Sequence, residues 1–147
     1  MRVNSKFSIA VHVLALLGIN KDSKEKNTSE LISKSVGTNP VVIRRLISNL
    51  KREGLVNTQP GIAGSTLAKD PSNITLLDIY KAVKPSEDAL VFDFHEKTSK
   101  ECPVGKNIKN VLKGPFIESQ KAMENKLAEY NLKDIIDEIK YLYIEEI

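Results

Sequence analysis

The chain has 147 residues, of which 41% are hydrophobic and 28% charged, and its net charge is +3 at pH 7. This length suits one domain, or one small domain with an appendage, and no apolar run approaches the ~18 residues that a membrane span needs. The single cysteine excludes an intrachain disulfide framework and a multi-cysteine zinc site, so we expect a reduced, cytoplasmic protein with no membrane partner.

Positive charge is concentrated towards the N-terminal end of the chain. Residues 1–60 hold 10 Lys+Arg and 4 Asp+Glu, whereas residues 61–147 hold 12 and 15. A basic surplus of this kind favours a polyanionic partner for the N-terminal part of the protein.

Residues 5–18 predict a first helix that is apolar almost all round, a pattern typical of a buried helix. Arg2, Asn4 and Lys6 precede or open this helix. They would either reach phosphates from its N-terminal end or be solvated as an ordinary terminus. A polar loop over residues 20–26 follows.

A short second helix is predicted after this loop. Asn27 or Thr28 would cap it, and Glu30 is placed to close a capping box from Asn27. The helix ends near Val36, and Gly37 makes a tight turn into the next element. A helix, a glycine turn and a further helix form a helix-turn-helix unit.

Residues 38–54 predict the third helix, and both of its ends are marked. Asn39 is a good N-cap, Pro40 suits the first helical position, and Gly54 suits the left-handed position that follows a helix. One apolar stripe recurs at helical spacing and consists of Ile43, Leu46, Ile47 and Leu50.

The opposite face of this helix carries arginine and hydroxyl groups. It consists of Val41, Arg44, Arg45, Ser48 and Arg52. A helix with one apolar face and one such polar face can lie in a DNA major groove. The alternative is a solvated basic face on an ordinary amphipathic helix.

Two β-prone runs, residues 55–58 and 62–68, flank a turn at Pro60 and Gly61 and predict a hairpin. A hairpin directly after the second helix of such a unit is a wing, and Gly61 and Gly64 would let it approach a phosphate backbone closely. A plain surface hairpin is the alternative. Thr75 then caps a fourth helix with Asp78 as its capping-box partner.

The run from Ile43 to Val83 resembles the Rrf-two (BadM-type) family of bacterial winged-helix transcriptional regulators. The matching residues, in order, are Leu50, Gly54, Leu55, Val56, Gly61, Gly64, Leu67, Ala68, Thr75 and Asp78. Ser65 departs from the pattern, since the family usually has a glycine there. The N-terminal run SKFSIAVHVLALL also looks like the first helix of the family.

Residues 89–94 are consistent with a short strand, and Cys102-Pro103-Val104-Gly105 follows. Family members that sense through an iron–sulfur cluster carry three cysteines in this region. This chain has one, and a cluster needs several thiolate ligands, so we expect no cofactor and no metal. The CPVG run is similar to the YwnA-like branch of the family. Cys102 is either a redox-sensing thiol or a small buried hydrophobe.

Gly114-Pro115 is expected to break or kink a helix. After it, a spacing that alternates between four and three residues gives a heptad-like seam at Phe116, Gln120, Met123, Leu127 and Tyr130. The seam would either pack on its own domain or, as the resemblance implies, pair a long helix across a homodimer. Asn131 with Asp134 can cap a last helix.

The predicted fold is mainly α with a small β-hairpin. A winged helix-turn-helix DNA-binding domain would span residues 1–84, and an effector-region loop with a long dimerisation helix residues 85–147. Phe116, Met123, Leu127 and Tyr130 would form the dimer contact, and Cys102 is the candidate redox sensor. The candidate DNA-binding residues are Thr38, Asn39, Val41, Arg44, Arg45, Ser48, Lys51, Arg52, Gly61, Gly64, Ser65 and Thr66.

The predicted function is sequence-specific regulation of transcription, as a repressor that binds double-stranded DNA as a homodimer on a pseudo-palindromic operator. The alternatives are a winged-helix protein–protein interaction module and a regulator that senses oxidation through Cys102. No H-E-x-x-H, G-x-S-x-G or phosphate-loop motif is present, so we expect no enzyme activity. The sequence does not identify an effector.

Overall fold

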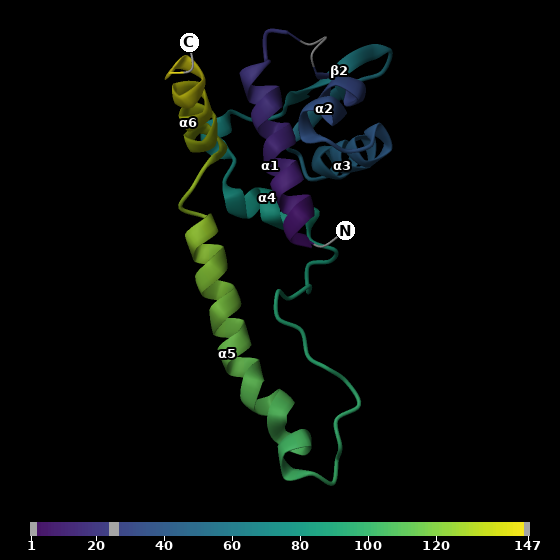
Figure 1. Ribbon diagram of the computed structural model, residues 1–147, viewed down its shortest axis with the longest axis vertical. Coiled ribbons are helices and arrows are strands. Elements are labelled where there is room, and N and C mark those ends of the chain that lie inside the picture. The colour runs from purple at the N-terminus through teal and green to yellow at the C-terminus, as the bar shows by residue number, and fades with distance from the viewer. Residues whose placement is uncertain (1–2, 24–26, 146–147) are drawn as a thin grey trace.

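The computed structural model describes residues 3–23 and 27–145, so Arg2 lies outside the described residues. Figure 1 shows a body of short helices with a hairpin, and one long helix that extends away from it. The elements are α1 (Val3–Ile19), α2 (Ser29–Val36), α3 (Pro40–Arg52), β1 (Val56–Gln59), β2 (Ile62–Leu67), η2 (Pro71–Asn73), α4 (Leu76–Val83), α5 (Pro103–Leu127) and α6 (Leu132–Glu145). The mainly helical fold with one antiparallel hairpin is therefore confirmed.

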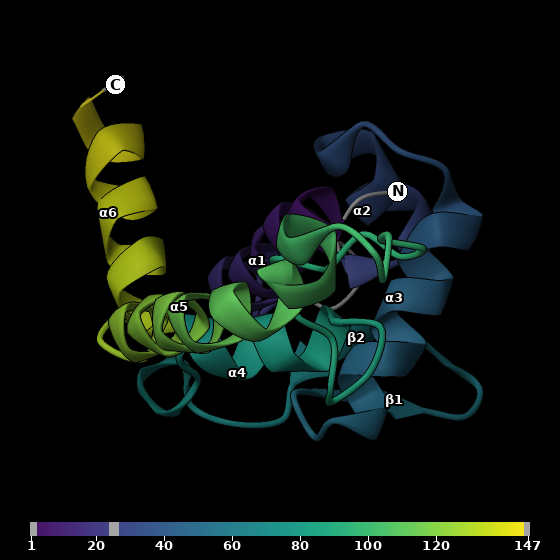
Figure 2. The same ribbon diagram turned by 90° about the horizontal axis from the view of Figure 1, so that it is seen from below.

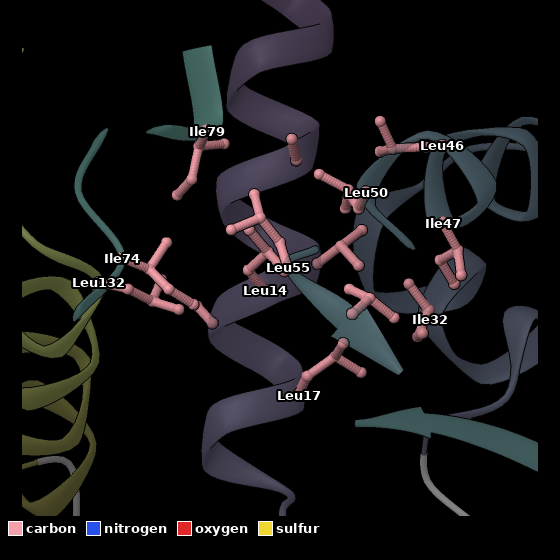
Figure 3. Close-up of a cluster of buried hydrophobic side chains, with 14 of the residues drawn as sticks. Leu14, Leu17, Ile32, Leu46, Ile47, Leu50, Leu55, Ile74, Ile79 and Leu132 are labelled. Atoms are coloured by element: carbon pink, nitrogen blue, oxygen red, sulfur yellow. The ribbon is translucent and has the colours of Figure 1, made fainter. Parts of the chain in front are cut away.

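The helix α1 runs through the centre of the body (Figure 3). Leu14 and Leu17 on this helix are fully buried. Side chains of α2 and α3 lie on one side of it, and those from the start of α4 and from α6 lie on the other. Because α1 has partners on several sides, most of its apolar surface is removed from water, and Ile19 at its C-terminal end is 36% exposed.

The ends of α3 and α4 have the predicted caps. The Oδ1 atom of Asn39 accepts a hydrogen bond from the Val41 N–H at 2.7 Å, and Gly54 adopts a left-handed φ of 77°. Thr75 and Asp78 form the reciprocal capping box. These bonds satisfy backbone groups that the helix itself leaves unpaired.

The cap of α2 is Thr28, whose hydroxyl accepts from the Leu31 N–H at 3.3 Å. The predicted capping box between Asn27 and Glu30 is therefore wrong. Asn27 is instead fully buried, and its Nδ2 group donates to the carbonyl of Ser65 in β2 at 3.1 Å. Glu30 is left free to face α3.

The hairpin pairs Val56 with Leu67 and Thr58 with Ser65, and its register shifts between Thr58 and Gln59. The shift leaves extra residues on β2, and Gly64 lies there with a φ of 95°. This conformation is accessible to glycine at little cost, which explains why the sequence retains a glycine at this bend.

The last helix returns to the body. The N–H of Leu132 donates to the carbonyl of Ile74 at 2.7 Å, and the N–H of Leu76 donates to the carbonyl of Tyr130 at 2.9 Å. Leu132 is fully buried in the same core as Leu14. The core therefore contains residues from both sides of the domain boundary predicted at residue 84. The helix α6 belongs to it because it covers one side of α1.

Two local expectations differ from the structure. Residues 89–94 form no strand; the Val91 N–H donates instead to the side chain of Gln120, and no strand edge of the described chain lies alongside to pair with. The helix α5 also continues through Gly114 and Pro115, so the break expected there is wrong and the kink stays a prediction. Pro115 is exposed, so water can solvate the carbonyl that the missing N–H would have bonded.

Among the described residues, none of the helices is sufficiently long and apolar to cross a membrane.

Replacing Leu14 by alanine should lower the free energy of unfolding by about 2–5 kcal/mol, because it leaves a cavity at a fully buried position. Leu31→Ala is a matched control, since the Leu31 side chain is 42% exposed, and it should cost less than about 1 kcal/mol. Urea denaturation followed by circular dichroism measures both values. Equal losses in the two variants would contradict a core centred on α1.

Candidate nucleic-acid interface

The exposed face of α3 consists of two rows of side chains. Ile43, Leu46, Ile47 and Leu50 are buried as predicted. Away from them, one row is formed by Arg44, Ser48 and Lys51, and the other by Arg45, Asn49 and Arg52. Each row follows from spacings of three and four residues, and Val41, 49% exposed, lies between the two.

The first row faces α2 and the hairpin. A nitrogen of the Arg44 guanidinium lies 3.1 Å from Oε1 of Glu30, and both side chains are more than half exposed. An ion pair this exposed contributes little to stability, so Arg44 can exchange Glu30 for another acceptor at small cost. Lys51 donates from Nζ to the Thr58 hydroxyl of β1 at 2.6 Å.

The second row faces α1 and the C-terminal end of α4. Arg45 and Asn49 line a shallow hollow together with Lys6 of α1. Arg52 donates to Oδ1 of Asn49 at 3.4 Å. In the described part of the chain, no carboxylate forms a salt bridge with Arg45 or Arg52. Both guanidinium groups are exposed and form no salt bridge among the described residues.

At the N-terminal end of α3, Thr38 is half-buried and Asn39 is exposed. The carbonyl oxygen of the Asn39 side chain is already occupied by its capping bond. Its amide group is the part of this side chain that remains to bind an external acceptor.

The hairpin lies beside the C-terminal half of α3, as Figure 2 shows from below. Gly61 and Gly64 both have a positive φ, of 76° and 95°, and Thr66 is half-buried. Ser65 is only 5% exposed, so its side chain is turned away from solvent, and a contact of this residue with DNA stays a prediction. The alternation of a strand turns the Ser65 side chain into the body, and its backbone carbonyl accepts the hydrogen bond from Asn27.

Asn27 is a residue whose role the sequence did not predict. Its buried amide links the loop before α2 to the carbonyl of Ser65 in the hairpin. A buried amide requires such partners. A side chain that sequence reasoning had placed in a helix cap thus ties the hairpin to the loop before α2.

The seam predicted on α5 is partly covered by its own chain. Phe116 is half-buried, and its ring centre lies 5.4 Å from that of Phe94 and 5.5 Å from that of Phe92. Gln120 is buried and donates to the Tyr80 hydroxyl of α4 at 3.3 Å. The remaining seam residues are less covered: Met123 and Leu127 are half-buried, and Tyr130 is 45% exposed.

A second apolar line on α5 was not predicted. Val104, Ile108, Val111 and Pro115 follow one another at spacings of four, three and four residues, so they share a face of the helix. Val104 and Val111 are 69% and 65% exposed. The sequence contains this spacing, but Pro115 led us to expect that the helix would break or kink there, so the four positions were not assigned to one continuous helix face.

Cys102 precedes the first residue of α5 and is exposed, so the alternative of a buried hydrophobe is wrong. Backbone hydrogen bonds from Gly105 and Val104 hold the pKa of the Cys102 thiol below its ordinary value. Such bonds favour the thiolate, which is the reactive form of cysteine.

Comparisons with known proteins agree with this geometry. The model of the Rrf2 family, described as an iron-dependent transcriptional regulator, matches residues 3–138. YwnA of Bacillus subtilis (strain 168), a candidate HTH-type transcriptional regulator, is 43% identical over 137 residues, which are 93% of this chain and 98% of YwnA.

Solved structures are also similar to this chain. A crystal structure of a candidate DNA-binding protein is 41% identical and has a TM-score of 0.71, with 89% of this chain and 98% of that chain covered. T. potens IscR, at 22% identity, shares the fold with a TM-score of 0.65 over 95% of this chain and 88% of its own.

The family description mentions iron, but this chain lacks a set of residues that could ligate an iron–sulfur cluster. The chain has one cysteine, and an iron–sulfur cluster needs several thiolates. Within residues 3–23 and 27–145, no three histidine, cysteine or acidic side chains are gathered as metal ligands. The residues of this chain do not fit such a cluster.

Alkylation of Cys102 by iodoacetamide should become fast at a lower pH than alkylation of an unstructured cysteine peptide. The reason is that the lowered pKa of this thiol makes the thiolate available at lower pH. Mass spectrometry of samples quenched at a series of pH values gives the profile, with Cys102→Ser as the unreactive control. A midpoint at or above that of the peptide would contradict the thiolate-stabilising geometry.

Proposed function

Since this chain belongs to the Rrf2 family of transcriptional regulators, as its match over residues 3–138 shows, we propose that it represses transcription by binding a pseudo-palindromic operator as a homodimer. The observation that carries this proposal is the exposed face of α3, where Arg44, Arg45 and Ser48 stand opposite the buried stripe. Its relatives are transcriptional regulators rather than enzymes. Because the proposed partner is double-stranded DNA, we place the protein in the cytoplasm.

In this proposal α3 enters the major groove. Arg44 and Arg45 read guanine through O6 and N7, the geometry for which a guanidinium is suited. Val41 and Ser48, with Thr38 and Asn39 at the start of the helix, contact base edges or phosphates. Lys51 and Arg52, near the end of α3, bind phosphate, and Gly61, Gly64 and Thr66 of the hairpin lie against the sugar–phosphate backbone.

The homodimer is proposed to form through α5. This helix extends away from the body (Figure 1) and exposes apolar side chains that the rest of the described chain leaves uncovered. Val104 and Val111 on one face, and Met123, Leu127 and Tyr130 nearer the body, supply the pairing surface. Phe116 belongs to the same pairing surface, where its ring packs against those of Phe92 and Phe94. Two-fold symmetry would place two α3 helices about 34 Å apart on successive turns of DNA.

A second candidate function is regulation by oxidation of Cys102. The observation in its favour is the exposed thiol with a lowered pKa, because the thiolate is the form that an oxidant attacks. The alkylation profile described above tests the reactivity that this function requires.

Arg44→Ala and Arg45→Ala should each weaken operator binding by about 1–3 kcal/mol and relax specificity at one base pair, if each pairs with guanine. Lys51→Ala should instead weaken binding to all sequences alike and flatten its salt dependence. Gel shifts on the upstream region of its own gene and on random DNA measure both effects. Unchanged operator binding in both arginine variants would exclude the assignment, and no DNA binding by the native protein would favour a protein–protein module.

Val111→Glu should shift the protein from dimer to monomer, with dimer affinity reduced at least about tenfold, or about 1.4 kcal/mol, because it places a charge on the exposed apolar line of α5. Asn110→Glu is the matched control, since Asn110 is exposed on another face of the same turn. Sedimentation equilibrium measures both constants. A native protein that stays monomeric at every concentration tested would rule out the homodimer.

A further inference from the structure

Two surface hollows beside α3 adjoin each other, since Lys6 and Asn49 line both. The first, of about 300 Å³, lies between α1 and α3 and is lined by Lys6, Ile9, Val42, Arg45, Leu46 and Asn49. The second, of about 360 Å³, shares Lys6 and Asn49 with the first and continues past Arg52 to Lys81 and Lys84 at the end of α4. We call Lys6, Arg52, Lys81 and Lys84 the basic strip.

The basic strip is assembled from three elements. Lys6 comes from the first turns of α1, Arg52 is the last residue of α3, and Lys81 and Lys84 lie in the last turn and at the C-cap of α4. Figure 1 shows that α4 ends beside the N-terminal end of α1, at the end of the body from which the chain continues towards α5. No single stretch of sequence therefore contains this cluster.

The charge of the basic strip is only partly balanced. Glu53 and Glu87 are the carboxylates that line the second hollow. None of the four cations belongs to a salt bridge in the part of the chain that the structure describes. The Lys84 ammonium donates to the carbonyl oxygen of Glu87 at 2.8 Å rather than to a carboxylate. An excess of positive charge in a concave surface attracts a polyanion.

The geometry of α3 shows where such a polyanion would run. This helix has 13 residues and is about 20 Å long. Its first exposed row leads to the hairpin through Lys51 and Thr58. Its second row leads in the other direction, through Asn49 and Arg52, into the basic strip. The hairpin and the basic strip thus flank the exposed face of α3 on its two sides.

We propose that the basic strip is a second phosphate-binding surface, which holds the DNA backbone on the side of the major groove opposite the hairpin. This inference rests on the proposed DNA-binding function. The strip would hold phosphates without reading bases, because ammonium groups on flexible stems bind as point charges. It sets the depth and register of α3 in the groove and increases affinity for every sequence.

The test is a double variant, Lys81→Ala/Lys84→Ala, with Lys121→Ala/Lys140→Ala as the matched control. The control removes the same charge from exposed positions of α5 and α6, away from α3 (Figures 1 and 2). Binding to operator and to random DNA is measured by fluorescence anisotropy at several salt concentrations between about 50 and 200 mM, an interval over which a protein that makes several phosphate contacts loses a measurable part of its affinity.

The slope of log affinity against log salt should fall by about 0.9 for each phosphate that the variant no longer neutralises, and so by up to about 3.6 for two lysines in each of two subunits. The ratio of operator to random affinity should stay unchanged. The control should keep the native slope, and Lys81→Arg/Lys84→Arg should restore it. The arginine variant retains the charge and serves as the positive control. Misfolding of the alanine variant would lower the midpoint of its own thermal melt, whereas loss of phosphate contacts changes the salt slope and leaves the melt unchanged.

A native slope in Lys81→Ala/Lys84→Ala would overturn the inference, and so would a loss confined to operator DNA. Either result leaves the proposed function intact, because the native protein still binds its operator. Failure of the native protein to bind any DNA would instead overturn the proposed function itself.

Discussion

Burial of α1 on several sides is the constraint on which the rest of this structure depends. A short chain gains most of its stability by removing apolar surface from water, and α1 presents such surface almost all round. The helix-turn-helix unit, the start of α4 and the returning α6 each cover part of it (Figure 3). Because Ile43 and Leu50 of α3 belong to that core, the opposite face of α3 has to point outward.

The orientation of α3 gives the stable core an exposed polar face, on which the proposed DNA contact depends. Four buried residues fix the rotation of the helix about its axis, and two rows of polar side chains follow on the exposed side. One row is continued by the hairpin and the other by the ends of α1 and α4. The same packing that holds Leu46 in the core therefore aims Arg45 and Arg52 at solvent, and it brings Lys6 and Lys84 next to them.

The long helix α5 follows a different physical rule. Its C-terminal part touches the body, where Gln120 meets Tyr80, and the segment with Phe92 and Phe94 covers one patch around Phe116. The rest exposes valine side chains that no described residue of the body covers. Apolar side chains along an extended helix are typical of a surface buried by association rather than by folding, which is why we place the dimer contact there.

The sequence by itself determined the local elements and the family. Caps at Asn39 and Thr75, the stripe from Ile43 to Leu50 and the glycines of the hairpin depend on interactions within a few residues, and local patterns record such interactions. The exposed face of α3 followed from the same periodicity. The family resemblance was carried by the same residues, and the sequence match over residues 3–138 confirms it.

Tertiary structure alone decided which of these residues remain at the surface and which lie together. Ser65 lies in the predicted wing, but its side chain is buried and its backbone carbonyl bonds to Asn27. The run at residues 89–94 had the composition of a strand, but no strand edge of the described chain lies beside it, and it packs on α5 instead. The basic strip joins residues from positions 6 to 84, and only the folding of α1, α3 and α4 around one core brings these charges together.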